Sequence, residues 1–320
     1  MSIETTSTLS NLVKTEYNRI LLENLYPNYL YGKFGDPGRM VTLATGANTV
    51  EWRRWGTLAA VTTPLTQAVT PAGSNHSVAL VTATPAQYGD FVLYSDILDM
   101  ASLDDFVRTT MVAQGYQAAE TLDQVSRDIL VAGTNVQYAG AVAGRSSVAS
   151  SNKLSISEVK KAVKTLRNAN VPTIGGSYIG IIHGNAAYDL MVDPEFILTS
   201  QYAGGTALYN GELGMYGGVR FLVTSNAKVF SAAGASSIDV YGSLIFGQHW
   251  FGGVKYMDET GGQKVPTAEG NFMVEMFIKP LGSGGSTDPL NQRGSVGWKV
   301  SHAMKILNQT CGLRIEHAVS

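Results

Sequence analysis

The feature that most limits the possible folds is a long amphipathic helix, predicted over residues 102–133. Apolar side chains recur there at intervals of three, four or seven residues, which places them on one helix face: Val107, Met111, Ala118, Leu122, Val125 and Ile129. Ser102 and Asp105 form an N-capping box, and Gly133 is a suitable C-terminal stop. About 30 residues at 1.5 Å each give a rod of roughly 45 Å. That length is unusual in a globular domain and predicts a structural spine.

A two-stranded excursion is predicted over residues 41–95, with strands at 49–55 and 77–84 and a low-charge connection between them. An isolated hairpin is only marginally stable in water. This one is therefore expected to lie across a neighbouring molecule. Residues 1–40 are predicted to form an arm that contains a short amphipathic helix and ends in a cluster of glycine and proline.

The second half of the chain predicts a compact α/β unit over residues 154–245. A helix at 155–170 begins at a Ser155–Glu158 capping box and ends before Pro172. A buried strand is expected at 178–183, followed by a short helix at 185–192. Residues 134–153 are interpreted as a linker, and residues 246–320 as mostly strands, so the fold class is α+β.

Composition favours a surface that is covered by other protein. Charged residues are only 15% of the chain and glycine occurs 35 times, whereas an average soluble domain has about 25% charged residues. Interface cores are depleted in charge in this way, although an ordinary enzyme of low charge also fits. The net charge of −2 argues against electrostatic binding of nucleic acid.

Candidate chemistry is sparse. The histidines (His76, His183, His249, His302 and His317) form no pair at metal-ligand spacing. Gly214, Gly217 and Gly218 lack the Lys-Ser/Thr ending of a phosphate loop and are interpreted as a turn. Cys311 is the only cysteine, so no intrachain disulfide can form. No signal peptide or membrane-spanning run is visible. We therefore predict no catalytic, cofactor-binding or metal-binding residues.

The run Trp52-Arg53-Arg54-Trp55 is a candidate contact with another subunit, because Trp and Arg are enriched at binding hot spots. Its expected partners are acidic residues on the long helix of the adjacent copy: Asp104, Asp105, Glu120, Asp123 and Asp128. Two other interpretations stay open, a half-buried strand with one charged face and a basic stripe for nucleic acid.

Three segments resemble the major capsid proteins of tailed bacteriophages of the phage N-four coat type. They are the hairpin with Tyr88-Gly89-Asp90 after it, the turn and strand at 210–221, and the loop at 288–299. The residues that carry the likeness in the last two segments are Gly211, Glu212, Gly214, Gly218, Asn291, Gln292, Arg293, Gly294, Trp298 and Lys299.

The resemblance implies the Hong Kong 97-type capsid fold. Its parts would be an N-terminal arm (1–40), an E-loop hairpin (41–95), a peripheral domain with the spine helix (96–153), an axial domain (154–245), and return strands to the peripheral domain with the C-terminal segment (246–320). The implied function is self-assembly, through hexamers and pentamers, into the icosahedral shell around the double-stranded DNA of a tailed phage. DNA would be enclosed without sequence-specific binding, and no membrane is involved.

The same resemblance implies a separate scaffolding protein, a portal and a decoration protein as further partners, with assembly in the host bacterial cytoplasm and a final location in the virion. Some members of the fold class fuse a scaffold region of about a hundred residues ahead of the arm. Only about 40 residues precede the hairpin here, so a scaffold, if one is used, is expected to come from another protein. No lysine lies between Lys33 and Lys153, which excludes the lysine–asparagine cross-link that some relatives make from the hairpin. The alternatives are an encapsulin-like nanocompartment shell protein and a cytoplasmic α/β enzyme without a recognisable site.

Overall fold

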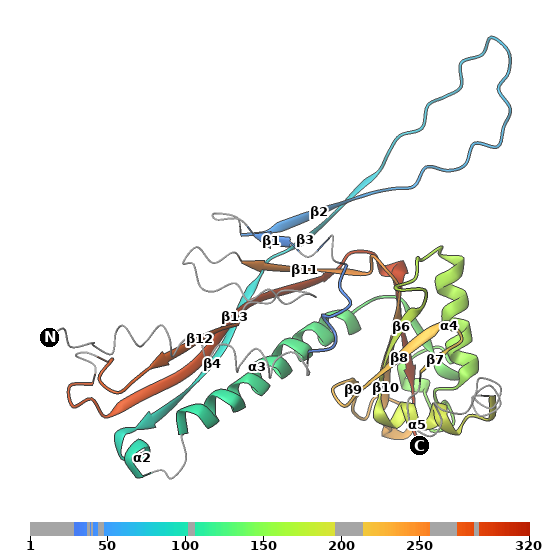
Figure 1. Ribbon diagram of the computed structural model, residues 1–320. Coiled ribbons are helices and arrows are strands. Elements are labelled where there is room, and N and C mark those ends of the chain that lie inside the picture. The colour runs from blue at the N-terminus through green and yellow to red at the C-terminus, as the bar shows by residue number, and fades with distance from the viewer. Residues whose placement is uncertain are drawn as a thin grey trace.

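The computed structural model describes residues 29–36, 39, 41–43, 48–101, 106–195, 214–256, 274–284 and 288–320. They form an elongated lobe, a compact lobe and a long projecting hairpin (Figure 1). The elongated lobe holds a 5-stranded sheet and the longest described helix, and the compact lobe holds a 7-stranded sheet with shorter helices. The helix predicted near the N-terminus lies outside the described residues.

Strand β13 (Arg293–Ile306), 14 residues long, is the centre of the elongated lobe. It pairs antiparallel with three strands, β4 (Ala86–Ser95), β11 (Phe251–Tyr256) and β12 (Val274–Lys279). Strand β1 (Val41–Leu43) extends the sheet by parallel pairing with β11. A short helix, α2 (Asp96–Ala101), follows β4 at the far end of the lobe.

Helix α3 (Phe106–Val131), 26 residues long, confirms the predicted spine helix. The expected cap at residues 102–105 lies outside the described residues. One face of α3 packs against β13 and its neighbours in a core made of Met111, Ala118, Ala119, Leu122, Tyr94, Val296, Trp298 and Val300. The amide of Gln114 donates to the carbonyl of Val296 at 2.8 Å. Small side chains at the contact let the helix approach the sheet closely.

The compact lobe has the strand order β5-β14-β10-β6-β8-β7, with β9 also paired to β10. Its strands are β5 (Val136–Tyr138), β6 (Tyr178–His183), β7 (Met215–Tyr216), β8 (Val219–Thr224), β9 (Lys228–Phe230), β10 (Val240–Phe246) and β14 (Gly312–His317). Short 3₁₀ turns lie at Ala139–Ala141, Arg145–Ser147, Ala235–Ser237 and Gln309–Cys311.

The helices of this lobe agree with the sequence. Helix α4 (Ile156–Asn168) begins at Ser155, whose side chain accepts a hydrogen bond from the backbone of Glu158. Helix α5 (Gly184–Val192) follows β6 directly. The predicted N-cap at Ser155 and the predicted strand at 178–183 are therefore confirmed. The other half of the predicted box is not: the carboxylate of Glu158 accepts from Nε2 of Gln137 at 2.7 Å.

Within residues 246–320, strands β11, β12 and β13 lie in the elongated lobe, whereas the C-terminal strand β14 pairs with β10 and β5 in the compact lobe. The predicted linker at 134–153 contains β5 and two of the 3₁₀ turns. β14 is buried along most of its length, so it needs a strand on either side to satisfy its backbone hydrogen-bonding groups. β10 and β5 are those two strands.

The hairpin consists of β2 (Val50–Trp55) and β3 (Val78–Ala83), with Trp55 opposite Val78. Residues 56–77 connect the two strands and extend far from both lobes (Figure 1). The paired strands agree with the prediction. The hairpin is nevertheless shorter than 41–95, because β1 and β4 belong to the sheet of the elongated lobe.

Two buried histidines make the fold sensitive to acid. His302 on β13 and His317 on β14 are 1% and 0% exposed. Burial lowers the pKa of each from 6.5 to about 4. Between pH 6.5 and pH 4 the unfolded chain binds protons at these histidines that the folded chain does not. The stability that depends on their neutral forms is therefore fully present above pH 6.5 and is lost as the pH falls toward 4.

Replacing His302 by Gln removes one of the two titrating groups. We expect the stability lost between pH 6.5 and pH 4 to shrink by about 3 kcal/mol, as measured by urea denaturation of the unassembled subunit. His76→Gln, which replaces an exposed histidine, is the control and should keep the wild-type dependence. Equal pH dependence in the two variants would contradict this account.

Candidate assembly surface

One face of the hairpin is attached to its own subunit. Trp52 is half-buried against Ala83 and Ala303. On the same face, Arg54 Nη1 donates to Asn308 Oδ1 at 2.8 Å. Two members of the predicted contact run therefore hold the base of the hairpin in place. The sequence pattern did not reveal this, although a strand must alternate its side chains between two faces.

The opposite face of the hairpin points away from the subunit. Arg53 pairs across the strands with Leu80, and Trp55 pairs with Val78. The side chains of Trp55 and Leu80 are 65% and 59% exposed. The ring of His76 meets Trp55 edge-on at 5.6 Å between centroids. We call Arg53, Trp55, Val78 and Leu80 the outer face of the hairpin.

The tip of the hairpin, residues 57–77, contains no Lys, Arg, Asp or Glu. Every residue of the tip is exposed. Its large apolar side chains are Leu58, Val61, Leu65 and Val69. A long uncharged segment with exposed apolar side chains marks a surface for protein contact.

The elongated lobe carries a second uncovered apolar surface. Tyr94 of β4 faces α3, so the alternate residues Phe91 and Leu93 lie on the other side of the sheet. Phe91 and Phe277 flank Gly297 in register on the two sides of β13. Phe91, Leu93 and Phe277 are 64%, 57% and 40% exposed. We call these three residues the open sheet face.

The open sheet face was not predicted from the sequence, although the sequence holds a signal for it. Residues 91–94 read Phe-Val-Leu-Tyr, without the alternation of apolar and polar side chains that a half-exposed strand shows. A continuous apolar run is typical of a strand that is covered on both faces. Within the described subunit, α3 covers only one of them.

The acidic residues expected to meet Arg53 and Arg54 have different environments. Asp104 and Asp105 lie outside the described residues. Glu120 is exposed and accepts a hydrogen bond from Gln124 at 2.9 Å. Asp128 is half-exposed and pairs with Lys228 at 3.0 Å.

Asp123 is 1% exposed, and its carboxylate accepts hydrogen bonds from its own subunit. The structure thus gives Asp123 a role inside the subunit instead of in a contact with Arg53 or Arg54 of a neighbour.

The loop at residues 288–299, which carries the strongest family likeness, forms contacts that hold the elongated lobe together. Asp288 is buried, and its Oδ2 accepts from the backbone of Arg293 at 2.8 Å. Trp298 Nε1 donates to Gln117 Oε1 of α3 at 3.0 Å. Gln117 Nε2 in turn donates to Asp90 Oδ2 of β4 at 2.6 Å. This chain of hydrogen bonds joins β13, α3 and β4.

Neighbouring positions of this loop are fixed by close packing. A Cβ at Gly294 would lie 2.3 Å from Cζ of Tyr94. Asn291 has a left-handed backbone with φ of 55°, and the carbonyl of Gln292 accepts from the backbone of Asp96 at 3.1 Å. Lys299 places its Nζ 5.3 Å from the ring centre of Phe277.

The other segment of the likeness is a tight turn before β8. Gly214, Gly217 and Gly218 all have positive φ, which glycine adopts at little cost. Gly211 and Glu212 lie outside the described residues. The part of the turn that is described therefore agrees with its interpretation as a turn.

One pair resembles a nucleophile with its base. Ser243 Oγ lies 2.8 Å from Nε2 of His317, and Nδ1 of His317 lies 2.8 Å from the carbonyl of Ala318. The carbonyl can only accept, so Nε2 accepts from the serine, as in nucleophilic catalysis. Ser243 and His317 are only 1% and 0% exposed, so a substrate has no access to the pair.

The described ranges hold no group of His, Cys, Asp and Glu side chains that could bind a metal ion. None of their helices has the length and apolar character needed to cross a membrane. Cys311 is buried, as expected.

The chain matches the family of phage capsid proteins over residues 78–315. This match spans most of its length, and the chain belongs to that family. The predicted role as the major capsid protein of a tailed bacteriophage is thereby confirmed, and an encapsulin-like shell or a cytoplasmic enzyme is disfavoured. No curated protein matches this chain in sequence.

Solved capsid structures share the fold. The capsid protein of cyanophage P-SCSP1u is similar with a TM-score of 0.64 and 15% identity, over 88% of this chain and 87% of that one. The capsid of cyanophage Pam1 is similar with a TM-score of 0.69 and 11% identity, over 85% of each chain. The capsid of Ralstonia phage GP4 is similar with a TM-score of 0.63 and 15% identity, over 85% of this chain and 84% of that one. The predicted fold class is confirmed.

Substituting Gly294 by Ala tests whether the signature loop has a packing role. The new methyl group must displace the buried ring of Tyr94, so we expect a loss of about 1–3 kcal/mol in the free energy of unfolding, measured by urea denaturation. Gly73→Ala is the matched control, since its Cβ would meet nothing within 4 Å. Equal stability of the two variants would refute the packing role.

Proposed function

We propose that copies of this chain form the shell by laying the hairpin of one subunit on the open sheet face of the next. The observation that carries the proposal is the exposure of every residue from 57 to 80. A two-stranded hairpin of this length is marginal by itself in water. A neighbouring subunit supplies the surface that it lacks.

The two surfaces are complementary in character. The tip is uncharged and exposes four large apolar side chains, and the open sheet face presents the rings of Phe91 and Phe277 with Leu93. Burying such side chains contributes about 25 cal/mol for each Å² of apolar area. Each contact can remain weak, because every subunit of a closed shell engages several neighbours at once.

Arg53 gives the contact its charged part. It lies on the outer face of the hairpin, whereas Arg54 is committed to Asn308. An exposed acidic side chain of the adjacent subunit is its proposed partner, and Glu120 is the described candidate. Asp104 and Asp105 remain candidates from the sequence.

Membership in the phage capsid family supports the remaining parts of the proposal. The shell encloses double-stranded DNA without sequence-specific contacts, in keeping with a net charge of −2. A scaffolding protein, a portal and a decoration protein are the expected partners. Assembly takes place in the host cytoplasm. The chain acts by association and not by catalysis.

The two tryptophans of β2 provide a matched test. Trp55→Ser alters the outer face, so we expect the yield of closed shells to fall by at least about tenfold while the free energy of unfolding stays near the wild-type value. Trp52→Ser alters the attached face and should cost about 2 kcal/mol of stability. Sedimentation and electron microscopy report assembly, and urea denaturation reports stability.

The contrast between the variants decides the outcome. A wild-type yield of closed shells from Trp55→Ser would contradict the proposed contact. A large stability loss in Trp55→Ser would show instead that its ring packs within its own subunit.

A further inference from the structure

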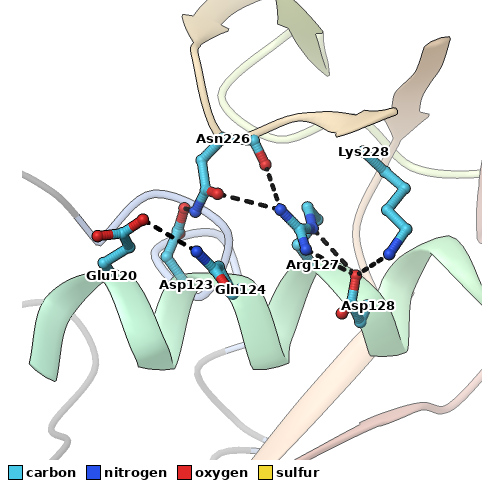
Figure 2. A network of polar contacts seen from close by, with 7 residues as sticks. All are labelled: Glu120, Asp123, Gln124, Arg127, Asp128, Asn226 and Lys228. Atoms are coloured by element: carbon cyan, nitrogen blue, oxygen red, sulfur yellow. Dashed lines mark hydrogen bonds and ion pairs between the residues drawn. The ribbon is translucent and has the colours of Figure 1, made fainter. Parts of the chain in front are cut away.

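A buried carboxylate joins three parts of the subunit. Asp123 lies on α3, in the elongated lobe, and is 1% exposed. Its Oδ1 accepts from the backbone N–H groups of Leu30 and Tyr31, both at 2.9 Å. Its Oδ2 accepts from Nδ2 of Asn226, at 2.8 Å, in the turn between β8 and β9 of the compact lobe. Figure 2 shows the carboxylate and this turn.

The segment at residues 29–31 lies between the cores of the two lobes. Tyr29 packs against the core that contains Trp298 and α3. Tyr31, two residues later, is 1% exposed and belongs to the core of the compact lobe. The hydroxyl of Tyr29 also lies 3.4 Å from Oγ of Ser126, which is itself 3.0 Å from Nε2 of His302. This short segment therefore contacts both lobes.

The turn of the compact lobe is held by two further groups on α3. Arg127 Nη1 donates to both the backbone carbonyl and Oδ1 of Asn226 at 3.0 Å. That contact fixes the amide so that Nδ2 points at Asp123 (Figure 2). Lys228 Nζ reaches Asp128 at 3.0 Å. Asp128 is half-exposed, so this last pair contributes little.

The energetics of Asp123 make its contacts depend on one another. Burial raises the pKa of this carboxyl, while the hydrogen bonds from Tyr31, Asn226 and Leu30 lower it. A buried carboxylate is stable only while its donors stay in place. If the turn withdraws, water reaches Asp123 and competes for the backbone donors, so the segment at 29–31 loosens as well.

From this geometry we propose that Asp123 is a latch that couples the segment at residues 29–31 to the position of the compact lobe. A pull on the chain just before residue 29 then changes the angle between the lobes, and a change of that angle loosens this segment. Copies of one chain in a closed shell can use such a coupling to adapt to different neighbours. The latch lies within one subunit, so it does not depend on the proposed hairpin contact.

Hydrogen exchange on the full-length, unassembled chain tests the coupling. Asn226→Ala removes the donor of the compact lobe without touching residues 29–31. We expect the amides of Leu30 and Tyr31 to exchange at least about fivefold faster, relative to the amides of α4. Lys228→Ala, at the start of β9 next to this turn, is the control and should change that ratio by less than about twofold, because its ion pair with Asp128 is partly exposed.

A second variant, altered in the segment at residues 29–31 and measured in the turn of the compact lobe, tests the coupling even if Asn226→Ala is poorly folded. Tyr29→Ala loosens the segment without touching the compact lobe, and coupling is reciprocal. We expect faster exchange in the turn at residues 225–228 and unchanged exchange in α4. An unchanged ratio in both variants, or an equal rise in α4, would overturn the latch.

Discussion

The packing of helix α3 against strand β13 is the interaction on which the rest of the subunit depends. β13 forms hydrogen bonds with β4, β11 and β12, and its apolar side chains cover the buried face of α3. The bond from Trp298 to Gln117 fixes the register of the helix on the sheet. The compact lobe then attaches to α3 through Asn226, and the hairpin attaches beside the end of β13 through Asn308.

A well-packed framework and large uncovered apolar surfaces exist in the same chain. The cores bury Phe246 and Trp298 almost completely, whereas Trp55, Phe91 and Leu93 remain mostly exposed. Scattered exposed apolar residues are common in any protein, but a contiguous set on a projecting hairpin indicates protein contact. A subunit of this kind reaches its full burial only inside a shell.

Local signals in the sequence predicted the elements that depend on local physics. The α3 pattern, the Ser155–Glu158 cap and the paired strands of the hairpin follow from helix periodicity, end hydrogen bonds and turn composition. The return of β14 to the compact lobe could not be predicted in this way. The position of β14 depends on which strands, distant in sequence, have an unpaired edge in the folded sheet.

The contact residues were predictable only in part. Alternation implied that Trp52 and Arg54 lie on one face and Arg53 and Trp55 on the other. Which face is attached is shown only by the distant residues Ala303 and Asn308, which the fold brings to the hairpin. Asp123 lies four residues after Ala119, on the buried side of α3. A charge at such a position indicates a buried partner, yet the donors at Leu30 and Asn226 come from parts of the chain that the fold alone brings together.

The most direct test of the account is a cryo-electron microscopy reconstruction of the assembled shell at side-chain resolution. We expect residues 57–77 to lie on a neighbouring copy, in contact with Phe91, Leu93 and Phe277, and Trp55 to be buried between the two chains. A hairpin folded back on its own subunit, or an open sheet face that stays exposed to solvent in the shell, would contradict the account.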